Sequence, residues 1–374
     1  MRIGTAEGQF ELSRELRRLL NSRIVQSSAK ASVEDQKDYI LEGPFAFDAN
    51  RDVRFSQNDN GLFRHSLILF TQQWVGIRQA CGAFPGHKLA IDSHNKFTLE
   101  QVEEILALLH QHHIKSVFVH GMAPSTSKLL RVVKRAMPEL RIFGVWHGTM
   151  AGWSYSEELA LFREFLSLAQ TRIFEKIGFL RTGMHHLSEY AFPKTLVNLV
   201  PKTDIERATL PFFTKPLKCI FPSWNNQWKN MFTNVVGAQS SPYVDEILAY
   251  SQSDIDIFSK LKHVPFIDHS AHMHRLSLID LCLNVSVNDC QPMTELEGLS
   301  VGTPSLRGDL DLDFVTLHEY ERLFTVSKYL NADAIRSKIS DLAALDGQYI
   351  FDIVVEYRQL LYKRSFERYS EFIN

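Results

Sequence analysis

Two acidic residues, Asp289 and Glu297, stand with seven residues between them, directly after the apolar run LCLNVSV (281–287). A Gly-x-Pro, formed by Gly302 and Pro304, follows them. The chain between the two acids runs into an expected helix start, whose free amides and positive dipole end favour an anion such as a diphosphate. A simpler explanation is that Asp289 caps this helix and Glu297 is an ordinary surface residue.

The residues at this helix start have backbone groups that could bind an anion. Met293, Thr294 and Glu295 are the candidate amide donors, and their N–H groups would approach a phosphate or a sugar hydroxyl. Pro292, just before them, has no N–H to give. We therefore expect the anion to lie beyond Pro292, at the first helical residues.

A cation and a glycine occur in two other loops. FPSWNNQWKN (221–230) contains Lys229 and Asn230, and a lysine can bind phosphate as a point charge. A solvated lysine at a helix start is the alternative. In QQWVGIRQ (72–79), Gly76 would allow a ligand to approach the backbone closely.

Two histidines end consecutive expected strands. His147 follows the apolar residues of LRIFGVWHG (140–148), and His120 follows those of SVFVHGM (116–122). A histidine at the carboxyl end of a parallel strand can hydrogen-bond sugar oxygens in either tautomer. A histidine satisfied within the core is the other explanation of each.

Two histidine-rich stretches, HQHH (110–113) and HSAHMH (269–274), raise the question of a metal site. Neither has partner acids or cysteines at convincing ligand spacing, so we expect neither a metal nor another cofactor. The sequence also has no nucleophile elbow, no P-loop lysine motif and no GxGxxG fingerprint. These absences argue against hydrolase, kinase and ordinary dehydrogenase functions.

Composition indicates an ordinary globular protein of 374 residues, 45% hydrophobic and 22% charged. Its formal net charge of -2 gives no reason to expect a nucleic-acid partner. Four scattered cysteines without CxxC spacing suit a reducing cytoplasm. No apolar run has the length of a signal peptide or a membrane span, so we predict a cytoplasmic protein.

From residue 65, short apolar runs alternate with amphipathic helical stretches, and this alternation predicts a parallel, doubly wound sheet. The length of the chain suits two domains of this kind. The expected strands of the first are LILFTQQW (67–74), KLAIDSH (88–94), SVFVHGM (116–122), LRIFGVWHG (140–148), RIFEKIGFL (172–180) and TLVNLVPK (195–202).

The alternation restarts after ATLPFFTKP (208–216), which looks like a linker. The expected strands of this second Rossmann-like domain lie in KCIFPSW (218–224), HVPFID (263–268), LCLNVSV (281–287) and LFTVSKY (323–329). Residues 350–373 have apolar positions at helical spacing and predict one long helix. We thus predict an extension (1–64) packed on the first domain, the first domain (65–207), the second domain (208–345) and a C-terminal helix (346–374).

The second half resembles the retaining, nucleotide-sugar-dependent glycosyltransferases of GT-B architecture, family 4 or group 1 type. That family has two acidic residues with seven between them and then a Gly-x-Pro, as at Asp289, Glu297, Gly302 and Pro304. The resemblance covers roughly residues 65–374 and is strongest over 218–345. It implies an α/β fold of two Rossmann-like domains facing a cleft, with a C-terminal helix that crosses back to the first domain.

The resemblance implies a role for each candidate. Glu297 would accept hydrogen bonds from both ribose hydroxyls, Asp289 would bind hydroxyls of the transferred sugar, and Lys229 would neutralise the diphosphate. His147 would lie near the donor sugar and the reacting carbon, with His120 as a weaker analogue. Base selectivity would depend on residues 266–270.

The sequence differs from the family pattern at three places. Asp289 stands where the family usually has Glu, and Pro292 where it has Gly. The first member of the family's basic pair is not evident near Lys229, where Trp224, Asn225 and Asn226 occupy the region. An unusual sugar specificity or lost activity would arise at these positions.

The function implied is transfer of a sugar from a nucleotide-diphosphate donor to a hydroxyl acceptor, with retention and without a metal. Its setting would be synthesis of bacterial surface polysaccharide, lipopolysaccharide or glycoconjugate. Closure of the two domains about the linker and the C-terminal helix would accompany the reaction. A nucleotide-sugar epimerase of similar fold and a non-catalytic glycosyltransferase-like subunit are the alternatives.

One basic helix bears on the acceptor. KLLRVVKRAM (128–137) alternates basic and apolar residues. Enzymes of this type often dock on the inner face of the membrane through such a helix to reach a lipid-linked acceptor, and attraction to anionic lipid with modest apolar insertion would suffice. A helix that covers the sheet and has a solvated basic edge is the other interpretation.

Overall fold

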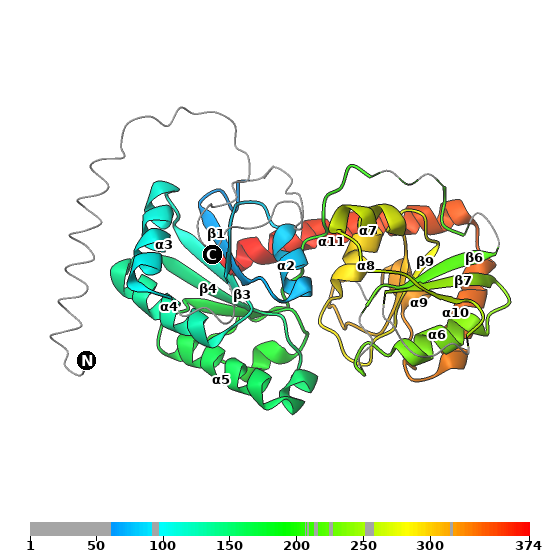
Figure 1. Cartoon of the computed structure of the whole chain (residues 1–374), viewed down its shortest axis with the longest axis horizontal. Helices are drawn as coiled ribbons and strands as arrows, with labels where there is room; N and C mark the ends of the chain where they lie inside the picture. The colour runs from blue at the N-terminus through cyan, green and yellow to red at the C-terminus, as the bar shows by residue number, and fades with distance from the viewer. Residues whose placement is uncertain are drawn as a thin grey trace.

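The computed structural model describes residues 61–91, 97–205, 207, 209–212, 216–223, 227–250, 258–314 and 317–374. All but the last four residues of the predicted extension (1–64) lie outside these ranges. The described chain forms two α/β domains, each built on one parallel sheet, and they lie side by side in Figure 1.

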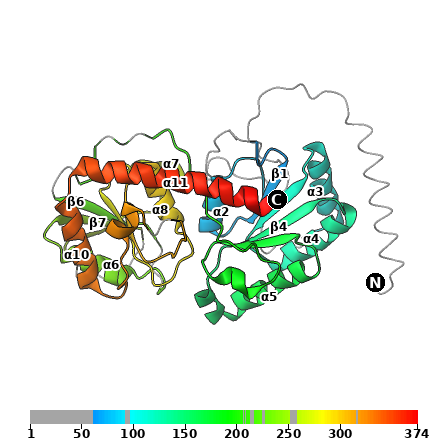
Figure 2. The same ribbon diagram turned by 180° about the vertical axis from the view of Figure 1, so that it is seen from behind.

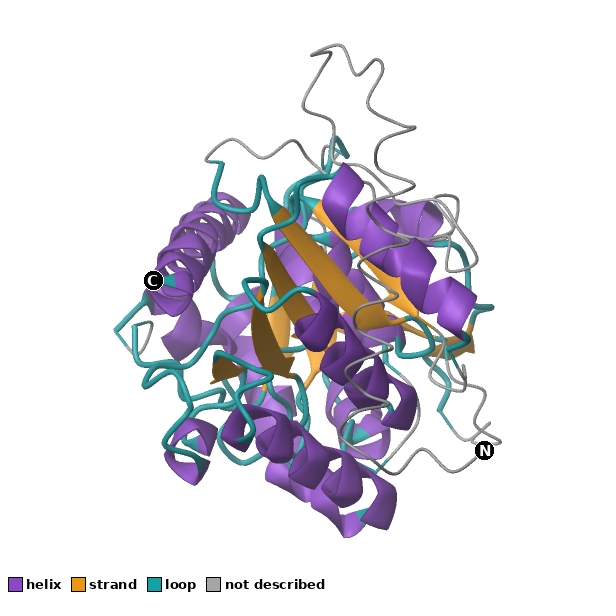
Figure 3. Cartoon of the chain, turned by 90° about the vertical axis from the view of Figure 1, so that its left-hand side faces the viewer, coloured by secondary structure: helices purple, strands orange, loops and turns teal. Residues whose placement is uncertain are grey.

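The first domain has a five-stranded sheet in the order β2-β1-β3-β4-β5. All neighbouring strands are parallel, and nearly every strand residue is buried, because helices cover both faces (Figure 3). The strands are β1 (Ser66–Thr71), β2 (His87–Ile91), β3 (Ser116–His120), β4 (Arg141–Trp146) and β5 (Lys176–Phe179). The helices are α2 (Val75–Gly82), α3 (Leu99–Gln111), α4 (Pro124–Ala136) and α5 (Ser156–Gln170), with 3-10 turns η1 (Met150–Ser154) and η2 (Met184–Leu187).

The second domain has a five-stranded parallel sheet in the order β10-β9-β6-β7-β8. The strand order reverses between β6 and β9, and ligands bind at such a switch point in this kind of sheet. The strands are β6 (Leu217–Phe221), β7 (Val244–Ala249), β8 (Leu261–His263), β9 (Leu281–Asn284) and β10 (Ser305–Arg307). The helices are α6 (Met231–Gln239), α7 (His269–Leu276), α8 (Met293–Ser300), α9 (Glu319–Phe324) and α10 (Ala332–Ala343).

Two predicted strands are wrong, and a third, HVPFID (263–268), overlaps strand β8 only at His263. LFTVSKY (323–329) begins in the end of helix α9, and Thr325 makes only an isolated bridge with Arg307. TLVNLVPK (195–202) runs beside β5, where the Leu196 amide donates to the Phe179 carbonyl at 2.8 Å, but it forms no strand. Both segments are apolar because they are buried, and burial alone does not require a ladder of hydrogen bonds.

The long C-terminal helix α11 (Gly347–Ile373) joins the two domains, as predicted. Asp346 caps its first turn by accepting from the amides of Gln348 and Tyr349. Residues 350–361 pack in the core of the second domain, whereas Tyr369 and Phe372 pack in the core of the first. Figure 2 shows this helix crossing in front of both domains.

Candidate functional site

A cavity of about 420 Å³, here called the first cavity, lies where the two domains meet. Its second-domain wall comes from the carboxyl ends of β6, β7, β8 and β9, and its first-domain wall from the start of α2. The lining residues are Val75, Gly76, Arg78, Gln79, Pro222, Ser223, Lys229, Tyr250, Phe266, Ile267, Asp268, His269, His272, Pro292, Met293, Thr294 and Glu297. The predicted glycine, lysine, helix start and second acid thus border one cavity.

Glu297 is completely buried in the wall of the first cavity. Its Oε1 lies 3.5 Å from Nδ1 of His269, and its Oε2 lies 3.3 Å from Nε2 of His272. Among the described residues, neither carboxylate oxygen has a hydrogen bond of normal geometry. A buried carboxylate in this state is ready to accept donors from a ligand, since leaving it unsatisfied costs free energy.

Two aromatic residues, Tyr250 and Phe266, lie beside His272 and Glu297. The Tyr250 hydroxyl lies 2.8 Å from Nδ1 of His272, and its ring stacks on Phe266 with centroids 5.2 Å apart. The Tyr250 phenol donates to Nδ1 when the ring proton of His272 is on Nε2, and that proton then faces Glu297. Burial lowers the pKa of His269.

The start of helix α8 has two amides open to a ligand. Within the described residues, the amides of Met293 and Thr294 make no hydrogen bond. The Glu295 amide, in contrast, donates to the Pro292 carbonyl at 3.0 Å. The Glu295 amide, which was predicted as a third donor, is thus already paired in this structure, and the first turn offers two donors to an anion.

Lys229 and Asp289 form an ion pair with 2.5 Å between Nζ and Oδ2. Burial alone would lower the pKa of Lys229, but the attraction and hydrogen bond of Asp289 outweigh it and raise this pKa. Asp289 Oδ1 also accepts from the Cys290 amide at 3.0 Å. Lys229 and Asp289, which were predicted to bind the diphosphate and the sugar, therefore contact each other in the described structure.

A second cavity, of about 390 Å³, lies on the other side of the loop 286–292. Pro292 borders both cavities, Lys229 borders the first, and Asp289 borders the second. The ion pair therefore stands between them. The second cavity is lined by Thr149, Met150, Arg181, Asn284, Ser286, Val287, Asn288, Asp289, Pro292, Arg307, Gly308, Asp309, Leu310, Ser327 and Tyr329.

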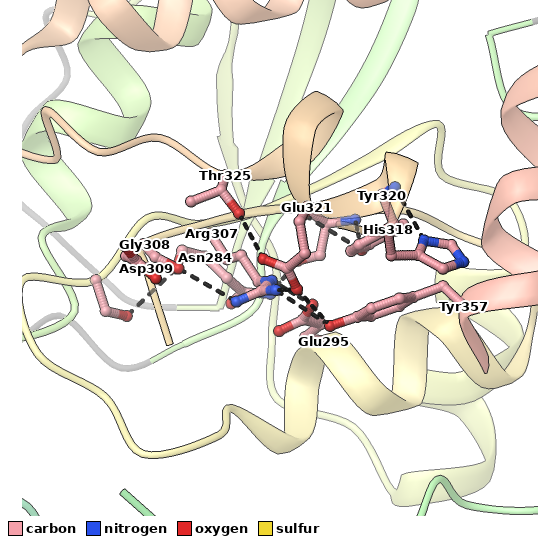
Figure 4. Close-up of polar contacts among 12 residues, drawn as sticks. Asn284, Glu295, Arg307, Gly308, Asp309, His318, Tyr320, Glu321, Thr325 and Tyr357 are labelled. Carbon is pink, nitrogen blue, oxygen red and sulfur yellow. Dashed lines mark hydrogen bonds and ion pairs between the residues drawn. The ribbon is translucent and has the colours of Figure 1, made fainter. Parts of the chain in front are cut away.

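Arg307 forms the buried floor of the second cavity, at the centre of a polar network (Figure 4). Its Nε lies 2.9 Å from Oε1 of Glu295, and its Nη2 contacts Glu321 and lies 3.1 Å from the Tyr357 hydroxyl. Burial raises the pKa of Glu295 to about 7, because desolvation of the carboxylate outweighs the attraction of Arg307. The Glu295 side chain thus stabilises the domain and does not face the first cavity.

The two predicted histidines pair with each other. Nδ1 of His120 and Nε2 of His147 are 2.8 Å apart, so one nitrogen donates and the other accepts. Burial lowers the pKa of His147 to about 3 and that of His120 well below its ordinary value. Neither histidine borders the two cavities, although the His147 carbonyl accepts from the Cys290 thiol at 2.9 Å. Their role toward a donor sugar stays a prediction.

Asn230 has a structural position that the sequence did not indicate. It adopts a left-handed conformation, with φ of 57°, at the N-cap of α6. Its side chain donates to the carbonyls of Val285 at 3.1 Å and Tyr329 at 2.7 Å. It borders neither cavity, so the structure does not support its predicted part in donor binding.

The loop that contains Asp289 is held by the first domain. The buried Gln291 amide donates to the carbonyls of Leu180 at 3.0 Å and Leu196 at 2.8 Å, and its oxygen accepts from the Asn198 amide at 2.7 Å. Arg181 donates to the Asp289 carbonyl at 3.1 Å. The shape of the second cavity therefore depends on both domains.

Sequence reasoning missed several residues of the first cavity, above all Arg78, Tyr250 and His272, and it gave His269 no contact with Glu297. The signal for the histidines was present, because the spacing in HSAHMH places His269 and His272 on one face of a helix. Phe266 and its neighbours had been predicted near the base, and residues 266–269 do line the cavity.

Two further expectations concern metals and membranes. No group of three or more metal-ligating side chains occurs in the part of the chain that the structure describes. None of the described helices combines the length and apolar character needed to cross a bilayer. On α4, Leu129, Leu130 and Val133 are buried, so the apolar side of this helix packs inward.

No protein-family model and no curated protein matches this sequence. Solved structures do match it in fold. A sucrose-phosphate synthase from Thermosynechococcus elongatus has a TM-score of 0.52 and 13% identity, over 83% of this chain and 95% of that one. A structure from E. coli, described as trehalose-6-phosphate bound with UDP-2-fluoro glucose, has a TM-score of 0.52 and 10% identity, over 82% and 98% of the two chains.

The chain has the GT-B fold. It shares with these structures the two parallel five-stranded sheets of Rossmann type, with helices around each. At 10% and 13% identity the similarity extends to the fold alone. What the chain does must be argued from its own site.

Proposed function

We propose that this protein is a glycosyltransferase that moves a sugar from a nucleotide-diphosphate donor to a hydroxyl acceptor. The observation that carries the proposal is Glu297, a buried carboxylate in the wall of an interdomain cavity that has no normal hydrogen bond to any residue described in the structure. The open amides of Met293 and Thr294 and the ammonium of Lys229 border the same cavity. A hydroxyl-binding acid beside an anion-binding helix start suits a nucleoside diphosphate.

The nucleotide would lie along the first cavity. Its ribose would bind Glu297, its base would lie near Phe266, and its diphosphate would accept from the α8 amides and Lys229. The missing first member of the family's basic pair has a candidate in Arg78, which enters the cavity from α2 of the first domain. Two cations from opposite walls would stabilise the charge that develops on the departing phosphate.

The transferred sugar would extend past Pro292 toward the second cavity, where Asp289 would accept from its hydroxyls. Binding of the diphosphate would draw Lys229 away from Asp289 and leave that carboxylate for the sugar. Retention would follow if the acceptor oxygen bonds to the anomeric carbon on the face from which the phosphate oxygen leaves. The leaving phosphate would take the acceptor's proton, and we propose that protein cations replace a metal.

The acceptor and the setting are proposals of the same kind. We infer a glycan or lipid-linked acceptor, approached from the first-domain side, in cytoplasmic synthesis of a surface glycan. On α4, Lys134 donates to the carbonyls of Pro138 and Leu140, and Arg131 pairs with Glu164. A membrane contact through 128–137 would therefore use the exposed charges of that helix, without apolar insertion.

A panel of nucleotides tests the proposal. The melting temperature of the whole chain is measured with UDP, GDP, ADP, TDP and CMP compounds, and any sugar donor that stabilises is then assayed for release of its nucleotide. We expect one class of nucleoside diphosphate to raise the melting temperature, because ligands that bind the native state stabilise it. If no nucleotide binds, the proposal is wrong; if the donor is converted to an isomer instead, the enzyme is an epimerase.

A further inference from the structure

We propose that His269 and His272 are positioning residues that hold Glu297 for a vicinal diol, and that His269 makes recognition of the ribose depend on pH. The inference rests on the proposed function, since it assumes that a nucleotide binds in the first cavity. It gives a role to HSAHMH (269–274), which the metal hypothesis left without one. It also predicts a preference for ribonucleotides over 2′-deoxyribonucleotides.

The two histidines approach Glu297 from one helix. Asp268 caps α7 by accepting from the Ala271 amide at 2.9 Å, which fixes the first turn. Residues three apart then lie on the same face, so His269 and His272 both point toward helix α8. Their side chains are 14% and 10% exposed, against 0% for that of Glu297. The contact is therefore almost fully shielded from solvent, except through the cavity.

The carboxylate has more acceptor positions than the histidines can fill. Its two oxygens offer about four lone-pair directions, and each histidine provides one N–H. Both oxygens and Nδ1 of His269 lack hydrogen bonds of normal geometry among the described residues. Two adjacent hydroxyls would supply one donor to each oxygen, whereas a single hydroxyl would satisfy one alone. The site thus matches a cis-diol.

Protonation of His269 would oppose diol binding. Asp268 on the same helix, Arg78 on α2, Glu297 on α8 and Tyr250 with Arg275 over its ring are the charged and titratable groups around the two histidines. Burial lowers the pKa of His269, so at neutral pH it is uncharged. At acidic pH a charged imidazolium would form a stronger ion pair with Glu297 and compete with the ligand hydroxyls. Affinity for the ribose should therefore fall as His269 becomes protonated.

Calorimetric titration of the full chain tests this inference. The nucleoside diphosphate found in the panel is compared with its 2′-deoxy form at about pH 8 and about pH 4.5, the lower value lying well below the ordinary histidine pKa of ~6.5 because the pKa of His269 is lowered. We expect the wild type to prefer the ribonucleotide roughly tenfold at the higher pH, the size expected for one hydrogen bond to a charged group, and far less at the lower pH.

Three variants separate positioning from folding. His272→Phe should lose the preference, because Glu297 loses its main support; His272→Gln, which keeps a donor, should restore much of it. His269→Gln should keep the preference but lose its pH dependence. The control is His274→Gln, an exposed residue of the same helix, which should behave as the wild type.

Failure of this inference and failure of the proposed function give different experimental results. Nucleotide binding without a ribose preference, or a preference and pH profile unchanged in the histidine variants, would overturn the inference and leave the proposed function intact. Absence of any nucleotide binding would remove both. Melting temperatures of the variants check that each is folded.

Discussion

At the residue scale, the ion pair of Lys229 and Asp289 gives the two proposed subsites a common boundary. Lys229 borders the first cavity and Asp289 the second, and their charged atoms are 2.5 Å apart. A donor diphosphate is a stronger partner for a lysine than one carboxylate. Donor binding would therefore separate Lys229 from Asp289, so that Lys229 contacts the diphosphate and Asp289 contacts the sugar.

Replacing Lys229 with Met tests this exchange. We expect Lys229→Met to weaken nucleoside diphosphate binding roughly tenfold or more, since a charge-assisted contact is lost, with a smaller effect on the nucleoside. Titration calorimetry measures both. Lys128→Met, at an exposed position on α4, is the matched control. Equal losses for diphosphate and nucleoside would argue against a phosphate contact at Lys229.

For the candidate residues, the sequence predicted positions along the chain better than contacts between side chains and backbone. The position of Asp289 and Glu297 after a buried strand predicted a place at the carboxyl end of the sheet, because ligands bind in the strand-to-helix loops of parallel sheets. The roles of Glu295 and Asn230 did not follow, since nothing in the sequence shows that the carbonyls of Pro292, Val285 and Tyr329 are their partners. Contacts of this kind depend on how separate elements pack.

At the element scale, strands with apolar side chains on both faces were predicted, and short or charged ones were not. Strand β7 contains Asp245 and Glu246, whose acidic side chains interrupt the apolar run of a buried strand. Strand β10 has three residues, too few to show a period. It ends at Arg307, whose charge is buried only because Glu295 and Glu321 pair with it.

The buried carboxyl of α8 predicts how stability depends on pH. The pKa of Glu295 is raised from 4.5 to about 7, so the folded protein holds a proton that the unfolded chain releases. This contribution to stability is fully present below about pH 4.5 and is lost as the pH rises to about 7. Glu295→Gln should flatten the decline in the free energy of unfolding over that window.

Denaturant unfolding at a series of pH values measures the effect. Glu356→Gln, at an exposed position on α11, is the control and should keep the wild-type slope. If the stability of Glu295→Gln falls with pH as steeply as that of the wild type, another group is responsible.

At the scale of the whole molecule, the loop after β9 and helix α11 both connect the two domains. Ser365 of α11 donates to the Asn198 carbonyl at 2.9 Å, and Gln291 accepts from the Asn198 amide. The same short segment of the first domain thus receives the long helix and the donor loop. Relative motion of the domains would change the shape of the second cavity directly.

Removing the Gln291 amide should loosen this connection. We expect Gln291→Leu to increase hydrogen exchange in residues 180–198 and 286–292, because three buried hydrogen bonds between the domains are lost and their backbone partners are left unsatisfied. Gln348→Leu, in an exposed position at the start of α11, should not have this effect. Unchanged exchange in both segments would show that other contacts hold the loop.

The central claim is that the interdomain cavity binds a nucleoside diphosphate through Glu297. Its most direct test is calorimetric titration of the stabilising nucleotide into the wild type, Glu297→Gln and the exposed control Glu104→Gln. The account predicts that Glu297→Gln weakens binding roughly tenfold or more, as expected for loss of charged hydrogen-bond acceptors, while the control binds as the wild type does. Undiminished affinity in a folded Glu297→Gln variant would contradict it.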